Sequence, residues 1–296
     1  MNPVLTGYLK LARPANLPTA AADILTGMAI AGLFSLSLAT TQFWISVVLL
    51  VFSSVFLYAG GVVLNDYFDY NIDLKERPER PIPSGVVSRN NALMFGSLLL
   101  LLGILLAFSV NQIAGGLAIL LTITILTYDA LAKNHKVLGP LVMGLCRGIN
   151  LLLGMALLLD FSYQIIALTP IMYIGAITMI SQGEVHGNNK KNIVLAGVMY
   201  LLVLLGILAA ALYWELALLE LLPFLMLFAI LIYTPLIKAY QVNSPENIKK
   251  AVKAGVLSLV VMDACMAAAF SHWWVGVLIL LLLPLSMALS RLFAVT

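Results

Sequence analysis

The sequence predicts an all-α fold, a polytopic helical bundle that spans a membrane. Of its 296 residues, 62% are hydrophobic and 10% are charged, and the mean hydropathy is +1.05. This composition excludes a soluble globular protein. Apolar windows long enough to cross a bilayer also recur along the whole chain. No linker rich in proline, glycine, serine or charge divides them, so residues 1–296 are predicted to form a single domain.

Ten apolar windows have the length of a membrane span, about 17 to 25 residues. The first two are separated by a short polar break, and the longest interruption follows the second. The predicted spans are 17–38, 44–65, 91–110, 113–130, 138–159, 165–183, 192–213, 216–238, 251–270 and 273–292.

The charges of the connecting loops alternate in a way that predicts the topology. Cytoplasmic loops carry an excess of Lys and Arg, and here the loops on one side hold these residues while the loops on the other side hold none. We therefore expect an integral, multi-pass protein, in a bacterial inner membrane, with both termini on the cytoplasmic side. The basic residues before span one and beside spans two, four, six, eight and ten are Lys10, Arg13, Lys75, Arg77, Arg80, Arg89, Lys133, Lys136, Lys190, Lys191, Lys238, Lys249, Lys250, Lys253 and Arg291.

Several other classes of protein are excluded by simple counts. The net charge is +3 and the basic residues are dispersed, so no nucleic-acid partner is expected. Cys146 and Cys265 both lie in apolar runs and indicate packing rather than a disulfide framework or a metal site. Residues 1–16 lack the pattern of a cleaved secretory signal. The sequence does not predict an oligomeric state.

The densest acidic cluster begins at the end of the second span. Asn65, Asp66, Asp69 and Asp73 are spaced three or four residues apart, which would place them on one helical face. Carboxylate and amide oxygens are ligands for a hard cation, and Mg²⁺ usually keeps open positions for substrate phosphates. The cluster therefore predicts a Mg²⁺ site. The alternative is a solvated helix end that happens to be acidic.

A basic loop follows directly. The stretch from Lys75 to Gly85 contains three prolines, which prevent a continuous helix. Arg77 and Arg80 lie in this loop, within a turn or two of the carboxylates. Guanidinium groups next to a carboxylate-held Mg²⁺ would form a receptor for a diphosphate. The alternative is a topology signal alone.

A second polar motif lies at the end of span six. Ser181, Glu184 and Asn188 have the spacing i, i+3, i+7 and could line one helical face opposite the acidic cluster. His186 would point elsewhere unless Gly183 or Gly187 ends the helix. A polar helix terminus with a glycine stop explains the same residues.

Arg147 and Asn150 lie in the middle of span five. An arginine in the hydrocarbon region is costly, so it should face the protein interior and an anion or dipole. Asp23 and Asp263 lie in other spans and either could be its partner. We interpret Arg147 and Asn150 as candidate substrate-binding residues.

Tyr128 and Lys133 end span four on the predicted cytoplasmic side. Tyr128 could be an interfacial aromatic residue and Lys133 a topology signal. Both are also placed where a phosphate would bind.

Together these motifs resemble the UbiA superfamily of intramembrane prenyltransferases. The resemblance rests on Asn65–Asp73 and on the stretch Arg77–Gly85, and it is supported by Arg13-Pro-Ala-Asn16, by Tyr128 and Lys133, and by the position of the second motif. It covers most of the chain. Members of this superfamily usually have nine spans, so we expect nine to ten.

The resemblance implies a helical bundle with a lipid-open cavity in which Mg²⁺ binds a prenyl diphosphate, the prenyl group being transferred to a hydrophobic or aromatic acceptor. Asp66, Asp69 and Asp73 would hold the metal, and Asn65 and Arg80 would contact the metal or the diphosphate. Lys133 would assist, and Asn16 would line the same cavity.

The second motif departs from the family pattern, which usually has three aspartates. Ser181, Glu184 and Asn188 retain one charge, although Glu184 can still bind a metal. This motif resembles the UbiA-like EboC branch. A transporter or carrier of a lipophilic metabolite that keeps the fold without catalysis is the alternative function, and charged residues in the spans suit either.

Overall fold

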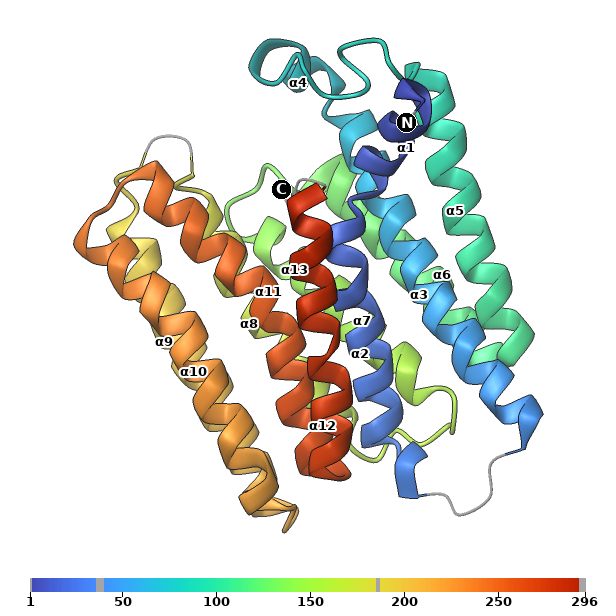
Figure 1. The fold of residues 1–296 in the computed structure, drawn as a ribbon, viewed down its shortest axis with the longest axis vertical. Helices are drawn as coiled ribbons and strands as arrows, with labels where there is room; N and C mark the ends of the chain where they lie inside the picture. The colour runs from blue at the N-terminus through green and yellow to red at the C-terminus, as the bar shows by residue number, and fades with distance from the viewer. Residues whose placement is uncertain (1, 36–39, 185–186, 293–296) are drawn as a thin grey trace.

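The computed structural model describes residues 2–35, 40–184 and 187–292, and the regular elements in these ranges are all helical. The long helices stand side by side in one bundle (Figure 1). The predicted all-α membrane bundle is confirmed. The helices are α1 (Pro3–Ala12), η1 (Pro14–Asn16), α2 (Leu17–Ile30), η2 (Leu33–Ser35), α3 (Thr41–Phe68), α4 (Tyr70–Glu76), α5 (Arg89–Val110), α6 (Gln112–Thr127), the π-helical turn η3 (Tyr128–Ala132), α7 (Leu138–Met155), η4 (Gln164–Ala167), α8 (Leu168–Ser181), α9 (Lys190–Tyr213), α10 (Leu218–Gln241), α11 (Pro245–Phe270), α12 (Trp273–Leu280) and α13 (Leu282–Leu292).

Within the described ranges, nine helical segments are long and apolar enough to cross a membrane. The predicted span 17–38 is not among them, because its helix, α2, has 14 residues. At 1.5 Å per residue that is about 21 Å, less than the roughly 30 Å of a hydrocarbon core. Nearly every residue of α2 is buried. The expected nine to ten helices are therefore nine long segments and one shorter helix inside the bundle.

The helices α2 and α7 approach each other closely because each has a glycine at the crossing point. A Cβ atom on Gly27 would overlap the carbonyl oxygen of Leu151, and one on Gly154 would overlap the carbonyl oxygen of Ile24. Small residues at a helix crossing let two backbones come into contact. This contact brings the polar residues of α2 and α7 together inside the bundle.

The long helix α3 bends at its end into α4. Asp69 separates the two helices, with φ −80° and ψ 0°, and its amide still donates to the carbonyl of Asn65. The segment after α4 then folds back on itself, with the amide of Val87 donating to the carbonyl of Pro81 at 2.9 Å. The helices α1 and α4 lie at the same end of the bundle (Figure 1). This end is where the polar residues gather.

Outer and inner helices differ in the surface that they expose. The helices α5 and α9 present rows of leucines on their outer faces, including Leu98 and Leu105 of α5 and Leu201 and Leu205 of α9. Such faces suit lipid. The helix α11 is buried along most of its length, so it belongs to the core that surrounds the polar residues.

Candidate active site

A cavity of about 460 Å³ lies among α2, α3, α6, α7, α8 and α11. Charged side chains from the α3–α4 region line one part of the cavity, Arg147 and Asn150 line another, and apolar residues such as Ile125, Ile174 and Leu259 form much of the remaining wall. Most of the predicted site residues line this one cavity. They are Asn16, Asn65, Asp69, Arg77, Arg80, Tyr128, Arg147, Asn150, Ser181 and Glu184.

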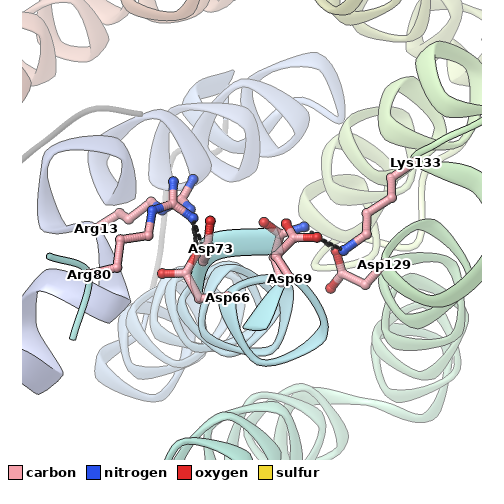
Figure 2. A network of polar contacts seen from close by, with 8 residues as sticks. Arg13, Asp66, Asp69, Asp73, Arg80, Asp129 and Lys133 are labelled. Carbon is pink, nitrogen blue, oxygen red and sulfur yellow. Dashed lines mark hydrogen bonds and ion pairs between the residues drawn. The ribbon is translucent and has the colours of Figure 1, made fainter. Parts of the chain in front are cut away.

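Arg80 connects the two ends of the acidic segment. Its guanidinium donates to Asp73 at 2.8 Å and to Asp66 at 3.2 Å. Arg13 donates to the same oxygen of Asp66 at 2.7 Å (Figure 2). Asp66 and Asp73 are both buried. Two buried carboxylates are thus held by two guanidinium groups that also line the cavity.

Asp69 lies on the other side of the α3–α4 bend. Its carboxylate forms an ion pair with Lys133 at 2.5 Å (Figure 2). Asn65 donates to Asp129 at 2.7 Å. Lys133 follows the π-helical turn η3, which carries Asp129. This second polar group therefore joins α3 to the end of α6.

The prediction that Asp66, Asp69 and Asp73 share one face is wrong for Asp69. The helix α3 ends at Phe68, and the bend at Asp69 turns its carboxylate toward Lys133, whereas Asp66 and Asp73 meet at Arg80. Among the described residues, no three His, Cys, Asp or Glu side chains are grouped closely enough to hold a metal ion. In this arrangement each carboxylate is neutralised by a basic side chain.

Glu184 reaches the cavity from the segment after α8. Burial raises the pKa of its carboxyl group above the ordinary value, and the positive charges of Lys249 and Arg77 oppose this rise. Arg77 belongs to the basic loop and Lys249 to α11. Glu184 is therefore influenced by the positive charges of two basic groups from distant parts of the chain, and it lines the same cavity as Asp69.

The second motif does not form the predicted helical face. The helix α8 ends at Ser181, whose hydroxyl donates to the carbonyl of Thr178. Asn188 has a left-handed backbone with φ 53° and is exposed, away from the cavity lining. A seven-residue spacing aligns side chains only while the helix continues. His186 lies outside the described residues.

Arg147 and Asn150 form the inner end of the cavity. Arg147 donates to Asp23 at 2.7 Å and to the Thr19 hydroxyl at 2.6 Å, and Asn150 donates to the same oxygen of Asp23 at 2.9 Å. Ser54 donates to Asn150 at 2.7 Å. Of the two candidate partners of Arg147, the structure therefore selects Asp23. The close crossing of α2 and α7 makes this pairing possible.

Two charged residues of the site were not predicted as site residues. Arg13, which the charge pattern assigned to topology, has a left-handed backbone with φ 45° and directs its guanidinium to Asp66. Burial lowers the pKa of the Arg13 guanidinium, but Asp66, Tyr58 and Asp69 together raise it above the ordinary value. Asp129 accepts from Asn65 and lines the cavity. A carboxylate so close to a span, directly after Tyr128, was the signal that could have identified it.

The donors at the polar end of the cavity have the chemistry that Mg²⁺ prefers, although the described carboxylates are not grouped closely enough in this arrangement to bind one ion together. Asp69, Asp129 and Glu184 all line the cavity with carboxylate oxygens, the ligands that hard divalent cations prefer. Oδ2 of Asp129 is buried and has no hydrogen-bond partner within the described part of the chain. Such an oxygen is costly to bury unless a cation or donor reaches it. Arginine and lysine beside these carboxylates suit phosphate oxygens.

The fold and the cavity define a class of protein, the multi-pass membrane proteins that hold a polar, charged cavity inside a helical bundle. Residues 24–242 match the profile of the UbiA prenyltransferase family. Since this match covers more than half of the chain, the protein belongs to the UbiA prenyltransferase family.

Curated relatives share one name. The chain is 40% identical over 147 residues to digeranylgeranylglyceryl phosphate synthase of Methanothrix thermoacetophila, a match that covers 49% of this chain and 52% of the relative. It is 39% identical over 137 residues to the synthase of the same name from Methanosarcina mazei, covering 46% of each. The matched part thus spans about half the length of these relatives.

Solved structures share the fold over nearly the whole chain. A digeranylgeranylglyceryl phosphate synthase superposes with a TM-score of 0.68 at 22% identity, covering 90% of this chain and 98% of the other. A UbiA homologue from Archaeoglobus fulgidus, bound to GPP and Mg²⁺, has a TM-score of 0.65 at 16% identity and covers 88% and 99%. These similarities show the UbiA fold.

Proposed function

We propose that the protein is a Mg²⁺-dependent intramembrane prenyltransferase that moves an isoprenyl group from a prenyl diphosphate to a lipophilic acceptor. The observation that carries this proposal is the cavity itself, whose polar end contains Asp69, Arg77 and Arg80 and whose walls include many apolar residues. A diphosphate requires the first environment and a prenyl chain requires the second.

The basic side chains have defined roles in this proposal. Arg13 and Arg80, now bound to Asp66, and Lys133, bound to Asp69, are placed to transfer their hydrogen bonds to diphosphate oxygens. Mg²⁺ held by Asp69, Asp129 and Glu184, with Asp66 and Asp73 nearby, would stabilise the charge of the departing diphosphate. Preorganised donors at the position where charge develops supply much of the catalysis in such sites.

The bond changes follow from the two substrates. The bond between the prenyl C1 carbon and the diphosphate oxygen breaks, and the electron pair leaves with the diphosphate. A nucleophilic atom of the acceptor forms the new bond to C1, and the acceptor releases one proton. Tyr128 lines the cavity, and its ring would stabilise the developing allylic cation; Tyr58 also lines the cavity, but its ring already contacts the Arg147 guanidinium.

The acceptor is proposed from the relatives. Their name, digeranylgeranylglyceryl phosphate synthase, denotes a prenylated glyceryl phosphate product. We propose a prenylated glycerol phosphate as the first acceptor to test, with hydrophobic or aromatic acceptors as the broader class. The EboC-like assignment rests on the altered second motif and stays a prediction.

The basic residues also indicate which side of the membrane the polar end of the cavity faces. The end of the bundle that carries the polar part of the cavity also carries basic residues, namely Lys75, Arg77, Arg80 and Lys133. Since cytoplasmic loops carry the basic residues, we place this end and both termini on the cytoplasmic side. The inner membrane of a bacterium and the single domain over residues 1–296 stay predictions.

The test uses purified protein in lipid nanodiscs with Mg²⁺ and labelled geranyl, farnesyl or geranylgeranyl diphosphate. We expect diphosphate release and a prenylated product with geranylgeranylglyceryl phosphate, and loss of both in Asp69→Asn. Asp160→Asn is the matched control, because Asp160 follows α7 and lies outside the cavity. Folded protein that neither binds nor turns over any of these donors would disprove the proposal.

The reduced charge of the second motif favours one alternative, a carrier of a lipophilic metabolite. Glu184 is the one carboxylate of that motif in the cavity. A carrier would bind the prenyl diphosphate but release no diphosphate with any acceptor, so the same assay separates the two functions.

A further inference from the structure

Asp263 is a buried carboxyl group that the proposed reaction does not use. It lies in the second half of α11, one turn beyond Leu259 of the cavity wall, and its exposed fraction is 0%. Neither of its side-chain oxygens has a hydrogen-bond partner among the described residues, and Oδ1 of Asp23 also lacks one. The Thr26 hydroxyl of α2 donates to the backbone carbonyl of Asp263 at 3.2 Å. Three carboxyl oxygens thus lack a donor in the interior of a membrane bundle.

The charges around Asp263 do not balance if it is ionised. It interacts with Asp23 of α2 and Arg147 of α7, and the other titratable groups near it are Tyr173 of α8 and Cys265 of α11 itself. Arg147 is the single cation in this group and is already paired with Asp23. An ionised Asp263 would leave one negative charge unneutralised, which costs several kcal/mol or more in a buried site.

The two carboxyl groups also lie within hydrogen-bonding reach of each other. Two carboxylates have no hydrogen to share, whereas a carboxylic acid and a carboxylate form a short, strong hydrogen bond. One proton placed there gives Oδ1 of Asp23 the donor that it lacks. It also makes the group of Asp23, Asp263 and Arg147 electrically neutral.

We propose that Asp23 and Asp263 form a proton-binding site in which Asp263 carries one proton and donates it to Asp23. Asp23 then accepts three hydrogen bonds, from Arg147, Asn150 and Asp263. Its orientation is fixed from both sides, by α7 and by α11. Asp263 is therefore a positioning residue for Arg147 and Asn150 at the inner end of the cavity, and this role does not depend on the identity of the substrates.

Infrared spectroscopy of the protein in nanodiscs tests the proton directly. With ¹³C-labelled aspartate, wild-type protein at alkaline pH should show the carbonyl stretch of a protonated, buried carboxylic acid. The band should vanish in Asp263→Asn and persist in Asp160→Asn, whose aspartate is outside the cavity and pairs with the Ser162 amide. Absence of the band would overturn the proposal. Loss of the band when sodium replaces choline in the buffer would also overturn it, because that result would show that a metal cation occupies the site.

Thermal unfolding supplies an independent readout. Asp263→Asn retains a neutral donor, so its Tm should match that of the wild type. Asp263→Leu removes the donor, and Asp23→Asn removes the counter-charge of Arg147, so both should unfold several degrees lower. A Tm of Asp263→Asn as low as that of Asp23→Asn would mean that Asp263 is ionised and would overturn the proposal. Should the variants fail to fold, the wild-type infrared spectrum alone decides.

Discussion

Arg80 and Asp73 form an ion pair of 2.8 Å that ties the proline-rich loop back onto the helix before it. The same guanidinium reaches Asp66 at 3.2 Å, on the last turns of α3. Groups suited to a diphosphate and groups suited to a metal are thus bound to one another at the polar end of the cavity. Binding of a Mg²⁺–diphosphate complex therefore requires these partners to be exchanged.

Arg80→Ala should weaken the binding of prenyl diphosphate. Truncating one partner of a buried charge pair typically costs about 2–5 kcal/mol, which corresponds to a loss of roughly 30-fold or more in affinity. The affinity is measured by titration of labelled diphosphate in the presence of Mg²⁺. Lys75→Ala removes an exposed basic residue close by and is the control. Equal effects of the two substitutions would indicate a general charge effect rather than a specific contact.

Lys133→Met should lower the rate of diphosphate release more than it weakens substrate binding. Lys133 is the partner of Asp69, and its ammonium group is placed to stabilise a leaving diphosphate. We expect a loss of about 100-fold in kcat, the size found when one preorganised donor is removed. Single-turnover assays separate this step from binding. Lys136→Met alters an exposed lysine three residues away, and its rate should equal that of the wild type.

Glu184→Gln should weaken Mg²⁺-dependent binding of the diphosphate if Glu184 is a ligand. Because burial raises the pKa of Glu184, the protonated form, which cannot bind a cation, accumulates at a higher pH than for an ordinary glutamate. Binding by the wild type should therefore fall on mild acidification, and Glu184→Gln should reduce this pH dependence. Titrations at several pH values measure both effects. Glu79→Gln changes an exposed residue in the basic loop and is the control. An unchanged Mg²⁺ affinity in Glu184→Gln would mean that Glu184 does not bind the metal.

Gly154→Val should destabilise the bundle and weaken substrate binding together. A side chain there would overlap the backbone of α2 at Ile24, and overpacking of this kind costs about 1–3 kcal/mol or more. Separation of α2 from α7 would also break the pairing of Arg147 with Asp23. The Tm in detergent is the measurement. Gly116→Val is the control, because a Cβ atom at Gly116 meets nothing within 4 Å.

Much of the architecture was predictable because lipid imposes strong constraints on composition. Ten apolar windows correspond to the nine long helical segments and α2. Ten predicted residues line one cavity although they come from different helices, since ionisable groups near a span are placed where a polar interior exists.

The failures have a common cause, the assumption that helices continue through the polar motifs. The bend at Asp69 separates it from Asp66 and Asp73, and the end of α8 at Ser181 removes Asn188 from the site. Periodicity assigns residues to a face only within a regular helix. Where a helix stops is decided by capping and by contacts with other segments, which spacing does not report.

By itself, the sequence determined the membrane class, the approximate spans and the region that carries the charged residues, because these follow from hydropathy and charge, which are properties of each segment. The tertiary structure alone decided the pairings. Arg147 pairs with Asp23 because two glycines let α2 and α7 pack in close contact. Arg13 reaches Asp66 because its left-handed backbone directs the side chain there. Such pairings depend on distances between residues far apart in the chain, and only the packing of the helices sets those distances.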